Sequence, residues 1–183
     1  MNKRITQIFN RLSKEKIDYY LISSKDEYLN EYAPLHNRRL EWLTNFSGSN
    51  GTAMISKNKK YFFTDGRYLL QAEKELDKKF HIVNSNTQDI FSIIGSNVNN
   101  KKILVDFKIF SIAFIKKLLL TAKLNSIEVI HDKENLIDQL WIDRPREDKK
   151  KFFFLKKNLY GMNTKKKIKK IFDKYNNDFL ILS

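Results

Sequence analysis

The sequence predicts an α/β fold in which a mixed, mostly parallel sheet is flanked by helices. Short apolar runs alternate along the chain with segments of helical periodicity, as where the run Ile103–Val105 is followed by Ser111–Lys123. Such alternation is typical of parallel strands joined by crossover helices. The runs Thr52–Ser56 and Tyr61–Thr64 are separated only by the polar turn 57–60. They therefore predict a hairpin that adds antiparallel pairing to the sheet.

The first segment is predicted to be an amphipathic helix. Its apolar residues recur at helical spacing: Ile5, Ile8, Phe9 and Leu12. A buried strand at 17–23 follows, then a loop around Pro34 and a short helix near 38–43. After the hairpin we expect a helix from Gly66, with Asp65 as its N-cap. The rest alternates, with strands at 80–83, 103–105 and 127–130 and helices at 87–94, 111–123 and 134–141.

The chain is predicted to contain one complete domain at 1–141 and the incomplete start of a second α/β domain at 151–183. Residues 142–150 are polar, include Pro145 and are interpreted as a linker. Beyond them the pattern restarts with a possible strand at 151–155, a helix capped by Asn163 or Thr164, and a strand at 179–182. A β-α-β opening of this length cannot cover both faces of a sheet, so the second domain is predicted only to begin.

Composition narrows the class of protein. The 183 residues are 42% hydrophobic and 13% aromatic, which predicts a globular chain, and they include no cysteine. Disulfides, a thiolate nucleophile and cysteine-ligated zinc are thereby excluded. No apolar run approaches the roughly 20 residues of a membrane span, and the first residues lack the apolar core of a signal peptide. We expect a cytoplasmic protein with no membrane partner.

The net charge of +14 raises the question of nucleic-acid binding. The excess is concentrated near the C-terminus, where residues 142–183 carry 13 basic against 5 acidic side chains. The lysine-rich helix at 165–174 could contact phosphate, and the aromatic run 152–154 could stack on bases. A helix that packs its apolar stripe on a sheet and leaves its lysines in water explains the same pattern more simply. We expect no specific nucleic-acid partner.

Catalytic and metal-binding motifs give no positive signal. Gly48 and Gly51 frame a Gly-Ser-Asn-Gly turn, but no Lys-Ser/Thr follows and a strand comes next, so a phosphate-binding loop is not indicated. His36, His81 and His131 are tens of residues apart, without the spacing of a helical zinc site. We predict no catalytic and no metal-ligating residue in this chain.

Four segments carry a resemblance to a known family. They are DEYLNEY at 26–32, RLEWLTNF at 39–46, FSGSNGTAMISKNKKYFFTDGRYLLQA at 46–72 and ENLIDQLWIDRP at 134–145. Together they resemble the N-terminal domain of aminopeptidase P, the Xaa-Pro aminopeptidases that share the creatinase and prolidase architecture. Two positions depart from the family. Tyr28 stands where many members have histidine, and Asn30 where many have serine, so any role of that histidine is absent here.

The resemblance implies a creatinase-like, ribonuclease-H-like N-terminal domain followed by a second, similar one. It also implies a parent metallopeptidase that removes the first residue from peptides with proline in second position. Two divalent metals, usually manganese, would be held there by an Asp, Asp, His, Glu, Glu set in a C-terminal domain. Nothing in these 183 residues matches that set, so we expect the chain alone to hold no cofactor and to be inactive.

The resemblance also implies partners and a role. The partners are the remaining domains of the parent enzyme, a second subunit in a homodimer, and peptide substrate only in the complete enzyme. The expected role is that of a non-catalytic N-terminal portion that contributes to oligomerisation and substrate access. Two alternatives stay open: a stand-alone, non-enzymatic interaction domain of the same fold, and a basic nucleic-acid-binding module.

Five residues are candidates for an interface or for substrate access. Asp65 and Arg67 form a charged corner, which could tie the hairpin to the following helix by charge-assisted hydrogen bonds or could face a neighbouring domain. Glu31, Arg39 and Trp42 place an acid, a guanidinium and an indole around a loop, where interface and packing roles are equally open. If Asp65 and Arg67 are partners, their substitutions should not be additive.

Overall fold

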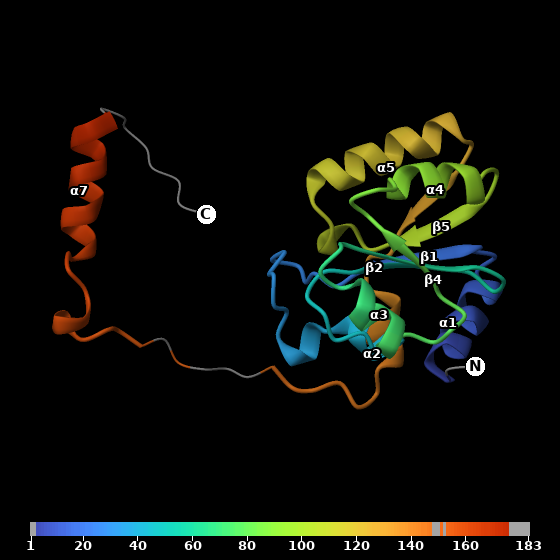
Figure 1. Cartoon of the computed structure of the whole chain (residues 1–183), viewed down its shortest axis with the longest axis horizontal. Helices are drawn as coiled ribbons and strands as arrows, with labels where there is room; N and C mark the ends of the chain where they lie inside the picture. The colour runs from blue at the N-terminus through green and yellow to red at the C-terminus, as the bar shows by residue number, and fades with distance from the viewer. Residues whose placement is uncertain (1–2, 148–150, 152, 176–183) are drawn as a thin grey trace. The chain divides into compact units, whose positions relative to one another are not determined.

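A computed structural model describes residues 3–147, 151 and 153–175 (Figure 1). The chain divides into two compact units, Met1–Glu147 and Asp148–Ser183. The first unit holds the sheet and the helices that cover it. Within the described residues, no helix is both long enough and apolar enough to cross a membrane.

The first unit is built on one six-stranded sheet. Its strands are β1 (Tyr19–Ser23), β2 (Thr52–Ile55), β3 (Lys60–Thr64), β4 (His81–Asn84), β5 (Lys102–Val105) and β6 (Glu128–His131). They lie in the order β4-β3-β2-β1-β5-β6. Only β2 runs antiparallel to its neighbours, β1 and β3, whereas β3 and β4, β1 and β5, and β5 and β6 pair in parallel. The predicted mixed, mostly parallel sheet and its hairpin are confirmed.

Helices cover both faces of the sheet. The helices of this unit are α1 (Lys3–Lys14), α2 (Arg39–Thr44), α3 (Leu69–Glu75), α4 (Ile90–Asn97), α5 (Ile112–Leu124) and α6 (Leu136–Leu140), with short 3-10 turns η1 (Leu35–Asn37) and η2 (Phe107–Ile109). Figure 1 shows α4 and α5 on one face and α1 and α2 on the other. The first group packs α4 on α5, and the second packs α1, α2 and α6 on one another.

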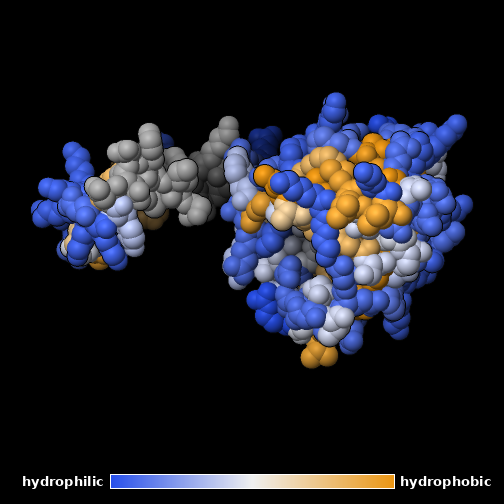
Figure 2. Space-filling view, turned by 90° about the horizontal axis from the view of Figure 1, so that it is seen from above, coloured by the Kyte–Doolittle hydropathy of each residue, from blue (hydrophilic) through white to orange (hydrophobic). Residues whose placement is uncertain are grey.

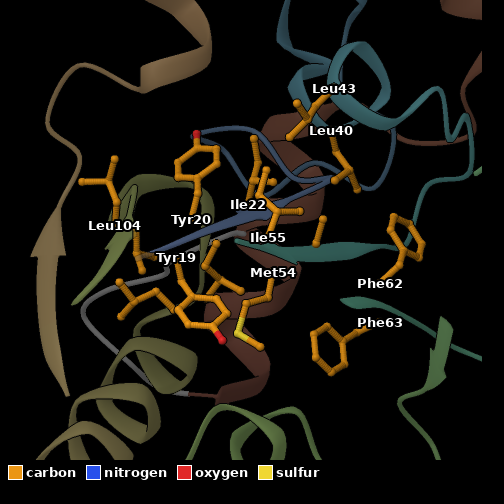
Figure 3. Close-up of a cluster of buried hydrophobic side chains, with 14 of the residues drawn as sticks. Tyr19, Tyr20, Ile22, Leu40, Leu43, Met54, Ile55, Phe62, Phe63 and Leu104 are labelled. Atoms are coloured by element: carbon orange, nitrogen blue, oxygen red, sulfur yellow. The ribbon is translucent and has the colours of Figure 1, made fainter. Parts of the chain in front are cut away.

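The core lies on both sides of β1, which is buried at every position. Tyr20 and Ile22 point from β1 toward Leu40 and Leu43 of α2, while Tyr19 points to the opposite face (Figure 3). A strand buried on both faces is expected to be apolar throughout instead of alternating, which is why β1 was recognisable as a continuous run in the sequence.

The helix expected from Gly66 begins later, at Leu69, and Asp65 is not its N-cap. Tyr68 occupies that position, and its backbone N–H donates to the carbonyl of Asp65 at 3.0 Å. Asp65 therefore closes a turn ahead of the helix. An aspartate followed by glycine suits both arrangements, so the sequence pattern did not separate them.

The second unit contains η3 (Lys157–Leu159) and α7 (Thr164–Tyr175) in its described part. The side chain of Asn163 accepts a hydrogen bond from the backbone N–H of Lys166 at 2.9 Å, so Asn163 is the cap that was expected here. The predicted strand at 151–155 is wrong for residues 151 and 153–155, which form no strand. These residues have no strand beside them to pair with within the described part of the unit. Phe152 and the strand predicted at 179–182 lie outside the described residues.

Candidate functional site

The carboxyl ends of the parallel strands meet at one edge of the sheet, where α/β folds commonly bind ligands. An aspartate follows four of these strands within three residues, and all four side chains belong to buried residues. They are Asp26 after β1, Asp65 after β3, Asp106 after β5 and Asp132 after β6. The use that the fold makes of these carboxylates decides what chemistry this edge can perform.

Each carboxylate is hydrogen-bonded within a local turn. Asp26 accepts the backbone N–H of Tyr28 and of Asn30 at 3.1 and 3.0 Å. Asp106 accepts the backbone N–H of Lys108 and the side-chain amide of Asn135. Asp132 likewise accepts the backbone N–H of Leu136. These turns are why the chain leaves each strand in a fixed direction.

The edge does not suit a dinuclear metal centre. Within the part of the chain that the structure describes, no three His, Cys, Asp or Glu side chains are grouped so that they could hold a metal ion. Burial raises the pKa of Asp132, which further disfavours the charged form that a metal ligand needs. The residues present therefore do not fit the pair of divalent metals that the resemblance implies for a complete enzyme.

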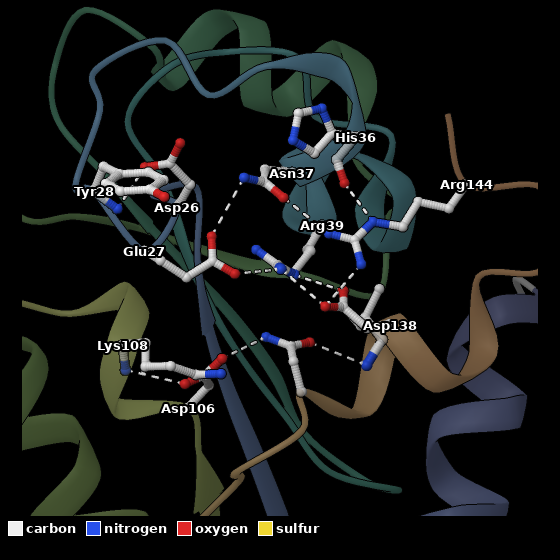
Figure 4. A network of polar contacts seen from close by, with 12 residues as sticks. Asp26, Glu27, Tyr28, His36, Asn37, Arg39, Asp106, Lys108, Asp138 and Arg144 are labelled. Atoms are coloured by element: carbon white, nitrogen blue, oxygen red, sulfur yellow. Dashed lines mark hydrogen bonds and ion pairs between the residues drawn. The ribbon is translucent and has the colours of Figure 1, made fainter. Parts of the chain in front are cut away.

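Arg39, at the first position of α2, is the buried centre of an ionic network whose other members are partly exposed (Figure 4). Its guanidinium donates to both carboxylate oxygens of Asp138, at 2.6 and 2.9 Å, and to Glu27 at 2.6 Å. The side chain is only 2% exposed. Burial alone would lower the pKa of Arg39, but the bonds to Asp138 and Glu27 outweigh burial and raise it. Nη1 is buried without a hydrogen-bond partner among the described residues.

Arg144 extends this network to the end of the first unit. Its guanidinium pairs with Asp138 at 2.8 Å, donates to the backbone carbonyl of His36 at 2.6 Å and to the side chain of Asn37 at 2.8 Å. Figure 4 shows the two arginines converging on Asp138. The network thereby joins the loop after β1, helices α2 and α6, and the segment that leaves α6.

Trp42, one turn after Arg39, also packs inside the first unit. Its indole is buried and stacks on Trp141 with ring centroids 5.7 Å apart. The guanidinium of Arg4 lies 5.1 Å from the indole centroid, and it donates to the carbonyl of Trp42 at 2.6 Å. An open cavity of about 290 Å³ lies beside the two indoles. Trp42 joins α1, α2 and the end of α6.

Asp65 and Arg67 form a fork-to-fork ion pair at the end of β3. Nε and Nη2 of Arg67 donate to the two oxygens of Asp65 at 3.0 and 2.9 Å, and Asn50 donates to Asp65 at 2.6 Å. The bonds from Arg67, and then that from Asn50, hold the pKa of Asp65 well below its ordinary value. The side chain of Asp65 is 12% exposed, whereas that of Arg67 is 68% exposed. A fixed guanidinium is thus presented to solvent.

Glu31 belongs to the same corner. Its charge, after the larger influence of Asp65, is among those that raise the pKa of Arg67. Glu31 also lines a small cavity of about 40 Å³ together with the loop 46–49. The structure therefore brings Glu31, Asp65 and Arg67 to one exposed corner and places Arg39 and Trp42 in the interior.

Three members of the Arg39 network were not singled out from the sequence. Glu27 and Asp138 lie 12 and 99 residues from Arg39, and Arg144 lies in the segment interpreted as a linker. Local patterns carry no signal for such pairings. The one available hint was that all three lie in the segments that resemble the family.

The Asp65 corner yields a stability prediction. Replacing Asp65 by alanine leaves Asn50 and Arg67 without their acceptor, and we expect the free energy of unfolding to fall by roughly 1–2 kcal/mol. Arg67→Ala should have a smaller effect, because its guanidinium is largely in water. Urea titration of both single variants and the double variant is the measurement. The double variant should lose less than the sum of the single losses. Strict additivity would show that the pair does not interact in solution.

The fold and the site define an α/β domain with a mixed sheet, whose edge carboxylates are engaged in its own turns. The chain belongs to the creatinase/prolidase N-terminal domain family, whose model matches residues 4–140. The resemblance found in the sequence is therefore confirmed.

Relatives among curated proteins support the same family. The chain is 30% identical to a probable Xaa-Pro aminopeptidase P of Coprinopsis cinerea over 178 residues, covering 93% of this chain and 28% of that protein. It is also 30% identical to Xaa-Pro aminopeptidase 1 of Dictyostelium discoideum, covering 93% of this chain and 29% of that protein. The chain thus spans less than a third of the length of these two relatives.

Solved structures confirm the fold. The X-prolyl aminopeptidase of Caenorhabditis elegans, a cytosolic enzyme with a di-nuclear active site, is 22% identical with a TM-score of 0.82. That similarity covers 95% of this chain and 31% of the enzyme. The N-terminal domain of the cytoplasmic peptidase PepQ from Mycobacterium tuberculosis is 19% identical with a TM-score of 0.59, covering 76% of this chain and 99% of that domain.

Proposed function

We propose that this chain is the non-catalytic N-terminal portion of a cytoplasmic Xaa-Pro aminopeptidase. In that role it contributes contacts between subunits of a homodimer and shapes the path by which peptide reaches a catalytic domain elsewhere in the enzyme. The two divalent metals, manganese by analogy with the family, would then be held by that other domain. The chain by itself releases no amino acid from a peptide.

One observation carries the proposal: similarity to Xaa-Pro aminopeptidases extends over 93% of this chain but over only 28% and 29% of two relatives. A chain that corresponds to under a third of an enzyme is expected to supply part of its architecture. The carboxylates of the sheet edge agree with this division, because each of the four accepts a hydrogen bond from a neighbouring turn of the domain itself.

The corner of Asp65 and Arg67 supports the role in substrate access. Asp65 accepts hydrogen bonds from Nε and Nη2 of Arg67 and so fixes the direction of the guanidinium, while Nη1 makes no hydrogen bond to the described residues. A fixed arginine that is mostly in water suits an encounter with a carboxylate, such as that of a peptide C-terminus or of a neighbouring domain. Tyr28 and Tyr32, in the loop that carries Glu31, are exposed and offer apolar contact area.

The proposal is tested with the purified chain and with a chimera. We expect the chain alone, with or without added Mn²⁺, to release no amino acid from a fluorogenic Xaa-Pro peptide. A chimera in which residues 4–140 replace the matching segment of the Caenorhabditis elegans enzyme should regain measurable turnover. Metal-dependent release by the chain alone would refute the assignment as non-catalytic.

The same chimera tests the corner. Arg67→Ala should raise KM several-fold while leaving kcat nearly unchanged, because the arginine is proposed to act on access and not on the chemical step. Arg11→Ala is the matched control, since Arg11 is also exposed and ion-paired but lies on α1. Equal KM and kcat values for the two variants would show that Arg67 takes no part in substrate access.

A further inference from the structure

The outer side of α5 carries four large apolar side chains that the first unit leaves uncovered. Its inner side packs Leu118 and Ala122 into the core, as a helix on a sheet must. On the outer side, Ile112, Leu119, Leu120 and Leu124 are 77%, 45%, 59% and 76% exposed. Figure 2 looks onto the side of α4 and α5 and shows hydrophobic side chains gathered there, with hydrophilic ones among them. Exposed apolar side chains gathered on one side of a helix indicate an interaction site.

The exposed side chains form an ordered pattern. At about 100° per residue, Ile112 and Leu119 fall on one row of the helix and Leu120 and Leu124 on another. Lys116 and Lys123, seven residues apart, fall between these two rows, and both are exposed. Neither has an ion-pair partner among the described residues, whereas Lys117, on the flank, pairs with Asp89. The helix contains no acidic residue.

We infer that this face of α5 binds an amphipathic helix of a partner protein that carries carboxylates between two rows of apolar side chains. The apolar rows would pack against the leucines and Ile112, and the carboxylates would pair with Lys116 and Lys123. Recognition of an amphipathic helix commonly combines apolar contacts with complementary charges. The surface is a property of the first unit and does not depend on the proposed peptidase role.

Charge disfavours two other occupants, a second copy of the chain and a membrane. A second copy packed through the same face would set lysine against lysine, with no acidic residue of α5 to compensate. A membrane would require the central Lys116 and Lys123 to enter the apolar layer with the leucines, whereas interfacial helices keep their lysines on the opposite face. A partner helix whose carboxylates lie opposite the two lysines can pack on the apolar rows and pair with the lysines at the same time.

The test uses the full chain and two synthetic helical peptides with the same leucine pattern, one with glutamates and the other with lysines at the intervening positions. We expect fluorescence anisotropy to show binding of the glutamate peptide and not of the lysine peptide. The double variant Lys116→Glu with Lys123→Glu should weaken binding of the glutamate peptide about tenfold or more and should now bind the lysine peptide. The double variant Lys74→Glu with Lys78→Glu is the control, and it should change the binding of neither peptide.

Three outcomes would overturn the inference. The first is that the original chain binds both peptides with equal affinity, or binds neither of them. The second is a dimer in sedimentation that Leu120→Ser abolishes, which would make a second copy the occupant. The third is binding to phosphatidylglycerol vesicles that Leu120→Ser abolishes, which would make a membrane the occupant. Because the substituted side chains are exposed, circular dichroism should show unchanged folding in every variant.

Discussion

Replacing Arg39 by methionine is expected to lower the free energy of unfolding by about 3–5 kcal/mol, as is usual when one member of a buried ionic group is removed. The substitution leaves Glu27 without its cation, and it leaves Asp138 with Arg144 as its only cation among the described residues. Methionine fills much of the volume, so the loss reports the charge and hydrogen bonds more than a cavity. Urea unfolding followed by tryptophan fluorescence measures it, since Trp42 and Trp141 lie beside the network.

Arg39→Lys is the matched control. Lysine keeps the charge but cannot donate to Asp138 through two nitrogens and to Glu27 at the same time, so an intermediate loss is expected. The buried and unpartnered Nη1 reduces the contribution of Arg39 to stability. The loss for Arg39→Met is therefore expected at the lower end of the range given above. A loss below about 1 kcal/mol for Arg39→Met would show that the network adds little net stability.

The network also predicts a dependence on pH. Burial alone would raise the pKa of Glu27, but the hydrogen bond and charge of Arg39 outweigh burial and lower it. A carboxyl whose pKa is lower in the folded state stabilises the fold above its unfolded pKa of about 4.3, and this contribution is lost as pH falls through the folded value. The original chain should therefore lose stability on acidification, and Arg39→Met should lose less over the same range.

Local periodicity was sufficient for the architecture. The alternation of apolar runs and helical segments predicted the sheet, and all six strands lie within or beside the predicted runs. It succeeded because burial imposes period two or a continuous apolar run on strands and a period of 3.6 on helices. Residues 151 and 153–155, by contrast, form no strand although the run is aromatic. An apolar run can form a strand only if another strand is available to pair with it.

The candidate site was less predictable than the fold. Asp65 and Arg67 are two residues apart, so their pairing was within reach of local reasoning and the structure brings them together. Arg39 meets Asp138 across 99 positions, and no local pattern specifies which acid a buried arginine will find. The distinction between an exposed corner and a buried network depends on tertiary packing. The sequence could therefore name Arg39 as a candidate without placing it in the interior.

The second substitution with a large expected effect is at Gly51, the last residue of the Gly-Ser-Asn-Gly turn. The turn lacks the sequence of a phosphate-binding loop, and the structure gives a steric reason for its second glycine. A Cβ atom on Gly51 would lie 2.6 Å from Cζ of Phe62 and 3.1 Å from a methyl group of Leu40. Both side chains are buried in the core (Figure 3). Glycine is needed here because the backbone passes directly against an aromatic ring.

Gly51→Ala is accordingly expected to lower the free energy of unfolding by about 2–3 kcal/mol, the upper part of the range for an overpacked core. The ring of Phe62 cannot move aside freely, because it packs edge-on against Phe46 at 4.6 Å and Phe80 at 6.3 Å between centroids. Gly66→Ala is the control. A Cβ there meets only Asn86, at 4.0 Å, so we expect a change within about 0.5 kcal/mol.

A second-site substitution separates steric overlap from a general loss of turn geometry. Phe62→Leu removes the ring atom that a Cβ on Gly51 would strike, at the expense of a cavity that lowers stability by itself. If overlap is the cause, Gly51→Ala should be much less destabilising in the Phe62→Leu background than in the original chain, with a coupling energy of roughly 1–2 kcal/mol between the two positions. Urea titration of the two single variants and the double variant measures this coupling. An equal loss in both backgrounds would mean that Gly51 is required by the turn that carries Asn50 toward Asp65, and not by the ring beneath it.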